Sequence, residues 1–345
     1  MWQLSKKTGL IVFSFIFITG IWLSEAAPQP TSDPGQKISE DIKEEVDEFF
    51  RVIINSNPYK RKEGMLKVLG TPGGFVDINK PQQYINEIRK RRWPGDEATK
   101  AKIEMVLKVL EDQNDFFNNR WEQVSSPTGN AEDTPEKFNT QSGRTMAAMC
   151  MAAQEKYEKE HWPSIIRDKK RKPLDRFYAA FYLARFYINT YYGTCSELTL
   201  VGDIPFEASE KEALVEAGHQ FHWEVLRLCA DKDREVSFLM QLDLAHQRYF
   251  HNVFPGRGDF VPAAIDGLDN DYLYFRLLSQ EYLEQITGQK FDLDPTDPPE
   301  IRASGVEKWR EWWRDNKYDL YYDPWSERLL PRRPQRRPEG QTTTQ

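Results

Sequence analysis

Apolar residues three and four positions apart recur through most of this 345-residue chain. The segment KISEDIKEEVDEFFRVI carries them at Ile38, Ile42, Val46 and Ile53, and ATKAKIEMVLKVLEDQ repeats the pattern from Ile103 onward. Such spacing puts apolar side chains on one face of an α-helix, whereas a half-buried strand alternates every second residue. The sequence therefore predicts an all-α protein.

The C-terminal half contains two copies of a longer pattern. EKEALVEAGHQFHWEVLRLCADKDREVSFLMQLDLAHQRYF predicts a helix, a tight acidic turn and a second helix, and DFVPAAIDGLDNDYLYFRLLSQEYLEQITG predicts the same order. Aligning the turns sets Asp233 and Asp271 38 residues apart. HWPSIIRDKKRKPLDRFYAAFYLARFY is a weaker third copy. Helix pairs with a period near 40 residues are typical of α-solenoids.

The end of the chain carries a motif of its own. The turn TGQKFDLDP is followed by a proline-rich spacer and by the helix WREWWRDN. This region resembles the terminal portion of bacterial exported HEAT-like repeat proteins, in which a TGQ-F-x-x-D-P turn precedes a W-R-x-W-W-x-x-N helix. The resemblance covers the C-terminal quarter well, residues 210–250 moderately and the N-terminal half hardly at all. Its counterparts here are Thr287, Gly288, Gln289, Phe291, Asp294, Pro295, Trp309, Arg310, Trp312, Trp313 and Asn316.

The resemblance implies a repeat with an aspartate in the turn and an arginine early in the second helix. Arg276 fits the arginine position, and either Asp269 or Asp271 fits the aspartate. In the preceding repeat Ser237 stands where the arginine is expected. We therefore expect a degenerate, irregular solenoid.

Three tryptophans share one face of the last predicted helix. Trp309, Trp312 and Trp313 stand at i, i+3 and i+4, opposite a face of mixed charge. Tryptophan buries a large area, and the end repeat of a solenoid needs a cap for its uncovered face. We predict a capping helix; the alternatives are a ligand or carbohydrate platform and a membrane-interface helix.

The first 26 residues have the features of a secretory signal. Lys6 and Lys7 precede the uncharged apolar run GLIVFSFIFITGIWL, and Ser24 and Ala26 place small residues at both recognition positions of a cleavage site. The run is short for a membrane span, which needs about 20 apolar residues. We expect cleavage after Ala26 and export to the periplasm or cell surface. The alternative is a retained N-terminal membrane anchor.

Two further segments differ in composition from the predicted helices. SSPTGNAEDTPEKFNTQ is polar with two prolines and a glycine, which is typical of a linker or surface excursion. PRRPQRRPEGQTTTQ carries no residue that would build a core and is expected to be disordered. The predicted order is signal peptide (1–26), irregular N-terminal helical region (27–124), linker (125–141), HEAT-like α-solenoid with a Trp-rich capping helix (142–325) and basic tail (326–345).

Charge limits the class of partner, and cysteine content limits the number of disulfides. The formal net charge is −7, which argues against nucleic acid as the main partner, as export does. Cys150, Cys195 and Cys229 are too few for a disulfide framework. One pair and one free thiol fit an oxidising compartment, but the sequence does not select the pair.

The histidines are the main candidates for chemistry. HQFH places His219 and His222 three residues apart, and a metal site would need both to face inward with His246 or Glu224. The zinc-protease pattern H-E-x-x-H is absent, so we expect solvated or core-edge histidines.

Other motifs favour structural roles. LGTPGG (residues 69–74) lacks the G-K-[ST] of a phosphate loop and predicts a turn. RKRRW (residues 89–93) predicts a helix end whose cations favour the C-terminal dipole, with an anionic surface as the alternative partner. No nucleophile elbow occurs, and no carboxylate pair stands out as acid and base. The sequence thus assigns no catalytic, cofactor-binding or metal-binding residue.

These observations favour an exported protein without enzymatic activity that holds protein partners, because stacked helix pairs form a long concave surface. The alternative is an all-α periplasmic enzyme or binding protein that acts on cell-wall or extracellular glycans, with a metal-dependent variant. We expect no cofactor, no nucleic acid and no membrane contact unless the N-terminal segment is retained.

Overall fold

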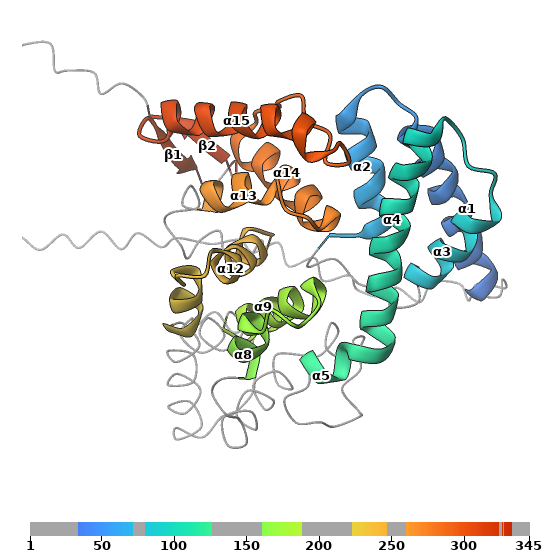
Figure 1. Cartoon of the computed structure of the whole chain (residues 1–345), viewed down its shortest axis with the longest axis horizontal. Helices are drawn as coiled ribbons and strands as arrows, with labels where there is room; N and C mark the ends of the chain where they lie inside the picture. Colours follow the sequence, from blue (N-terminus) through green and yellow to red (C-terminus); the bar gives the residue numbers. More distant parts are fainter. Residues whose placement is uncertain are drawn as a thin grey trace, which may run out of the picture. The chain divides into compact units, whose positions relative to one another are not determined.

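The described part of the chain is helical apart from one small sheet (Figure 1). A computed structural model describes residues 34–71, 80–125, 161–187, 223–246, 260–323, 326 and 328–332. Met1–Glu40 form one unit and Asp41–Gln345 another, and all contacts given below lie within the second. The prediction of an all-α protein is confirmed. No helix in these described ranges combines the length and apolar character that a membrane span requires.

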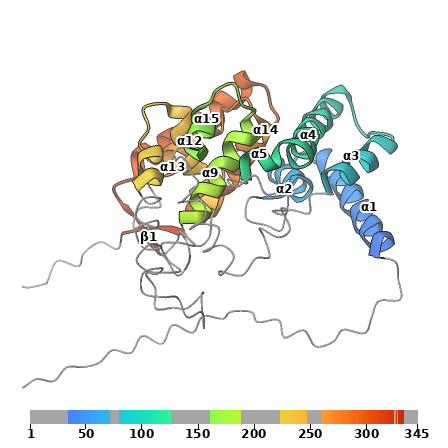
Figure 2. The same ribbon diagram turned by 90° about the horizontal axis from the view of Figure 1, so that it is seen from below.

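The N-terminal helices follow the predicted periodicity. They are α1 (Pro34–Ile53), α2 (Pro58–Leu69), α3 (Lys80–Lys90), α4 (Glu97–Asp115), the π-helix η1 (Phe116–Arg120) and α5 (Trp121–Ser125). Asn57 and Asp96 begin α2 and α4 by accepting backbone N–H groups of the first turn. Gly70 ends α2 with φ 74°, a conformation that favours glycine. The α4 helix contacts both α2 and α3, and both views place it beside them (Figures 1 and 2).

The later helices form hairpins that pack in chain order. The elements are α8 (His161–Arg167), α9 (Pro173–Tyr187), the helical residues 223–229, α12 (Arg234–His246), α13 (Val261–Gly267), α14 (Leu273–Thr287) and α15 (Pro299–Asn316). The α9 helix packs on α8 and α12, α13 packs on α12 and α14, and α15 packs on α13. Consecutive hairpins therefore lie against one another.

The three hairpins share one hydrogen-bonding device. The fourth residue of each second helix is Arg176, Ser237 or Arg276. Arg176 Nε donates to the carbonyl of Ile166 at 2.7 Å, and Ser237 Oγ donates to the carbonyl of Cys229 at 2.6 Å. Arg276 Nη1 donates to the two turn carbonyls of its own hairpin at 2.7 and 2.9 Å. Arg176 and Ser237 satisfy carbonyls at the end of the first helix, and Arg276 satisfies carbonyls of the turn that follows it.

This device corrects the sequence alignment by one residue. Ser237 and Arg276 are 39 residues apart, whereas Asp233 and Asp271 are 38 apart. The helices α12 and α14 begin at Arg234 and Leu273, which are also 39 residues apart, so the turn aspartate equivalent to Asn270 is Asp231. The alignment on Asp233 and Asp271 is therefore wrong.

The small sheet lies in a region predicted partly as tail. Strands β1 (Leu320–Asp323) and β2 (Arg328–Pro331) pair antiparallel, with Tyr321 opposite Leu330. Leu329 is buried and joins the hydrophobic cluster around Trp309, which explains why this part of the predicted tail belongs to the fold. The predicted signal peptide and nearly all of the predicted linker (125–141) lie outside the described residues.

One hydrophobic cluster joins the N-terminal helices to the hairpins. It runs from Ile42 to Leu278 and contains residues of α1 to α5 together with residues of α9, α12 and α14. At its centre the ring of Phe116 stacks on that of Tyr178 at 4.5 Å with an interplanar angle of 11°. The Trp162 indole N–H donates to the Val124 carbonyl, which ties the end of α5 to α8. The N-terminal helices are therefore part of the hairpins' core.

Candidate interaction surface

His246, the described member of the candidate metal-binding histidines, is engaged by backbone. His246 Nε2 lies 2.9 Å from the Leu278 carbonyl oxygen, and Glu224 forms an ion pair with Arg227 at 2.6 Å. His219 and His222 lie outside the described residues. Among the residues that are described, no three His, Cys, Asp or Glu side chains are grouped as a metal site would require.

The three tryptophans of α15 differ in burial. Trp309 is 1 % exposed, and its ring meets that of Phe291 at 4.7 Å and 84°. Trp312 and Trp313 are half-buried at the margin of the same cluster. Trp309 is therefore unavailable to a carbohydrate platform, and its packing agrees with the predicted cap.

The remaining sequence candidates have local roles. Arg89 and Lys90 end α3, where Arg89 pairs with Glu111, and the Trp93 indole donates to the Ile88 carbonyl at 3.0 Å. The prediction of a helix end there is confirmed. Burial raises the pKa of the Cys229 thiol to about 12, which makes it a poor nucleophile. Cys150 and Cys195 lie outside the described residues.

The end of the TGQ-F-x-x-D-P segment, at residues 293–296, is buried and held by charged side chains. Asp294 Oδ2 accepts from Arg61 of α2 at 2.6 and 3.0 Å and from Lys102 of α4 at 2.6 Å. Asp294 Oδ1 accepts from the backbone N–H and the hydroxyl of Thr296. Burial alone would raise the pKa of Asp294, but the hydrogen bonds from Lys102 and Thr296 together hold it below its ordinary value.

Two arginines hold the backbone of the same loop. Arg276 Nε donates to the Pro295 carbonyl, and Arg302 Nη1 of α15 donates to the Asp297 carbonyl, both at 2.6 Å. Burial, with the nearby charge of Arg302, lowers the pKa of Arg276 to about 10. The loop thereby joins α2 and α4 to the last hairpin and to α15. We call Asp294, Arg61, Lys102, Arg276 and Arg302 the junction charges.

A second buried ion pair supports the same junction. Lys62 is 2 % exposed, and its ammonium group contacts Glu281 and lies 2.7 Å from Glu284 of α14. The sequence contains a signal for it, since Lys62 lies in helical register with the buried Met65, Leu66 and Leu69. A lysine on an apolar face must find an anion when it is buried.

The face of the second helices is partly covered by the chain itself. The α5 and η1 elements pack on α9, while α2 and α4 pack on α14 (Figure 1). We expected a partner to use the concave surface of stacked hairpins. The protein's own N-terminal helices occupy these faces of α9 and α14, so a partner would have to use other surfaces.

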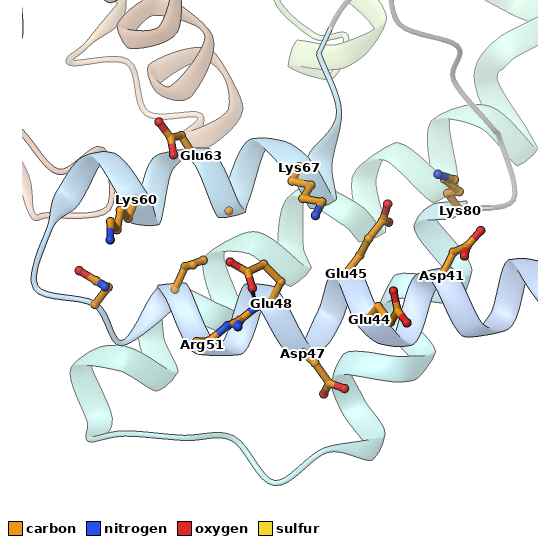
Figure 3. Close-up of a pocket in the computed structure, with 13 residues that line it drawn as sticks. Asp41, Glu44, Glu45, Asp47, Glu48, Arg51, Lys60, Glu63, Lys67 and Lys80 are labelled. Carbon is orange, nitrogen blue, oxygen red and sulfur yellow. Dashed lines mark ion pairs between the residues drawn. The ribbon is translucent and has the colours of Figure 1, made fainter.

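An open groove lies between α1 and α2 (Figure 3). Its volume is about 1190 Å³, and carboxylates of α1 form one wall while lysines of α2 stand on the other. Gly64 and Val52 lie at its floor, and a side chain on Gly64 would collide with Val52. The lining residues are Asp41, Glu44, Glu45, Asp47, Glu48, Arg51, Val52, Asn55, Lys60, Glu63, Gly64, Lys67 and Lys80.

The charges of the groove do not neutralise one another across it. Where the α1 carboxylates have partners, these lie on α1 or α3: Glu48 pairs with Arg51, Asp47 pairs with Arg91 at 2.8 Å, and Glu45 accepts from the Tyr84 hydroxyl. Within the described part of the chain, no ion pair or side-chain hydrogen bond forms at six of the lining residues. These are Asp41, Glu44, Lys60, Glu63, Lys67 and Lys80.

Comparison of the chain with protein families, with curated proteins and with solved structures finds no match.

Proposed function

We propose that this chain is an exported, non-enzymatic helical-repeat protein that serves as a protein–protein interaction scaffold. The observation that carries the proposal is the recurrence of one hairpin design. Arg176, Ser237 and Arg276 occupy the same position in hairpins that pack in chain order, and each donates to backbone carbonyls at the helix end or turn that precedes its own helix. Repetition of a unit that contacts only its neighbours is the building principle of helical-repeat scaffolds.

The terminal motif supports the same proposal. The TGQ-F-x-x-D-P loop and α15 follow the last hairpin, and Trp309 fills the cluster that α13, α14 and α15 share. In a repeat protein the last unit requires such a cover. Export is supported by the N-terminal sequence through Ala26, with its positive start, apolar run and small residues at the cleavage positions.

The distribution of charge favours binding over chemistry as the use of the surface. Asp294, Lys62 and Arg276 are all deeply buried and hydrogen-bonded to structural partners. These buried charged groups stabilise a junction, as structural ion-pair networks do. The α1–α2 groove instead offers exposed charges of both signs, the composition of the polar parts of protein interfaces.

A cross-linked pull-down from the native cell envelope tests the proposal. The tagged full-length chain is expressed in its own cells, cross-linked, captured and analysed by mass spectrometry. An unrelated exported protein with the same tag serves as the control. We expect a reproducible partner near one-to-one stoichiometry. Capture of no such partner, together with measurable binding of cell-wall glycan, would contradict the scaffold proposal and favour the glycan alternative.

A further inference from the structure

We propose that the α1–α2 groove is the docking site for a partner helix that carries basic side chains along one side and acidic side chains along the other. The inference rests on the proposed function and names the surface and the chemistry of the partner. It depends on four properties of the groove: its walls, its charge balance, its floor and its length.

The walls of the groove are two neighbouring helices joined by a short turn. Ile53 ends α1 and Pro58 begins α2. Two such helices leave a furrow that a third helix fills in small bundles, and helices commonly bind partners in this way. At the floor of the groove, Gly64 lacks a side chain where one would collide with Val52, so α1 and α2 approach each other closely there.

The charge balance excludes a partner of a single sign. The lining contains six acidic and four basic residues. A polyanion would meet Asp41, Glu44 and Glu45 on α1, while a polycation would meet Lys60 and Lys67 on α2. A partner with both signs, arranged on opposite sides, satisfies both walls. Such charge complementarity sets partner choice more than raw affinity.

The open charges distinguish this groove from the outer face of α15. On α15 the charges pair within the helix, with Arg310 and Glu307 at 3.6 Å and Arg314 and Glu311 at 4.0 Å. In the groove, Asp41 lies opposite Lys80 and Glu45 lies opposite Lys67, and no ion pair joins these described residues across the groove (Figure 3). An external partner would therefore form more new ion pairs in the groove than on the outer face of α15.

The length of the walls sets the size of the partner. Lys60 to Lys67 spans two helical turns, and Asp41 to Val52 spans three. A partner segment of about 12 residues would cover the groove at about 1.5 Å per residue. Because exposed ion pairs each contribute little, we expect weak, salt-sensitive binding.

The test uses three synthetic helical peptides of equal length, each held helical by a covalent staple because free short helices are marginal in water. One carries lysine along one side and glutamate along the other, one carries lysine on both sides and one carries glutamate on both. Binding to the full-length chain is measured by fluorescence anisotropy at ionic strengths of about 0.05 and 0.5 M. We expect the mixed peptide to bind about tenfold more tightly than either uniform peptide at low salt.

A charge-reversal variant gives the decisive comparison. Asp41→Lys with Glu44→Lys changes the lining from six acidic and four basic residues to four acidic and six basic residues, so the all-glutamate peptide should become the tightest ligand. Glu307→Lys with Glu311→Lys on the outer face of α15 is the matched control and should leave the order unchanged. Equal binding of all three peptides, no salt-sensitive binding of the mixed peptide, or an unchanged order in the groove variant would overturn the proposal.

The pull-down separates this inference from the proposed function. If the native partner is still captured in full by the Asp41→Lys, Glu44→Lys chain, the scaffold proposal stands and the groove assignment fails. If the wild-type chain captures no partner, the scaffold proposal itself fails.

Discussion

Two sets of charged residues, the junction charges and those that line the α1–α2 groove, differ in burial and in partners. Asp294 and Arg276 are each 4 % exposed, and their polar atoms are bound by defined donors or acceptors. Asp41, Glu44 and Lys67 are exposed and unpaired within the described residues. Removing one partner from a buried network leaves a desolvated charge, whereas removing an exposed charge costs almost nothing. The junction should therefore control stability and the groove should control binding.

The largest effect is expected from Asp294→Asn. The substitution removes the anion that Arg61 and Lys102 share and should lower the free energy of unfolding by about 3 kcal/mol. Urea unfolding followed by circular dichroism measures the loss. Asp292→Asn, at an exposed position two residues earlier, is the matched control and should change stability by less than about 0.5 kcal/mol. Equal effects of the two substitutions would show that Asp294 does not hold the junction.

The next largest effect on stability is expected at the position that Arg276 and Ser237 share in two hairpins. Arg276→Met leaves three carbonyls without their donor and should cost about 2–4 kcal/mol. Ser237→Ala should cost about 1 kcal/mol or less, because Gln241 Nε2 still donates to the Cys229 carbonyl at 2.9 Å. Urea titration of both variants gives the two losses of unfolding free energy, and their ratio tests whether the two side chains have equivalent roles in their hairpins. A larger loss for Ser237→Ala would contradict it.

A smaller effect on stability is expected from lowering the pH. The pKa of Asp294 is lower in the folded protein than in the unfolded chain, where it is about 3.9. Its contribution to stability is therefore full above that value and is lost as pH falls through the lower folded pKa. The stability difference between the wild type and Asp294→Asn should shrink below about pH 4. A difference that stays constant from pH 6 to pH 3 would contradict the ion-pair account.

The smallest effect on stability is expected in the groove. Asp41→Lys with Glu44→Lys should change the free energy of unfolding by no more than about 0.5 kcal/mol, because neither carboxylate has an ion-pair partner among the described residues. The same urea titration measures it. A loss comparable to that of Asp294→Asn would remove the distinction between the two sets of charges.

The sequence predicted the helices because their apolar periodicity is a local property. Ile42, Val46 and Ile53 are buried as their spacing indicates, and Trp309 is buried as the capping argument requires. The one-residue alignment error arose because Asp231 and Asp233 both lie in an acidic turn, and only the starts of α12 at Arg234 and α14 at Leu273 show that Asp231 matches Asn270.

The junction could not be predicted in the same way. Asp294 and Arg61 are 233 residues apart, and Asp294 and Lys102 are 192 apart. No periodicity relates such distant residues. Lys62 on an apolar face was the available local signal, and it indicates a buried partner without naming it. The groove likewise depends on how α1 and α2 pack, which charge alone does not encode.

Cross-link mapping on the captured complex tests the central claim most directly. Lysine-reactive cross-linking of the wild-type chain to its partner, read by mass spectrometry, locates the contact surface. The groove predicts that cross-links concentrate on Lys60, Lys67 and Lys80. Exposed lysines elsewhere, such as Lys308 of α15 and Lys108 of α4, serve as internal controls. They should be modified by the reagent without becoming cross-linked to the partner. Cross-links that concentrate on Lys308 or Lys108 instead would contradict the assignment of the binding surface.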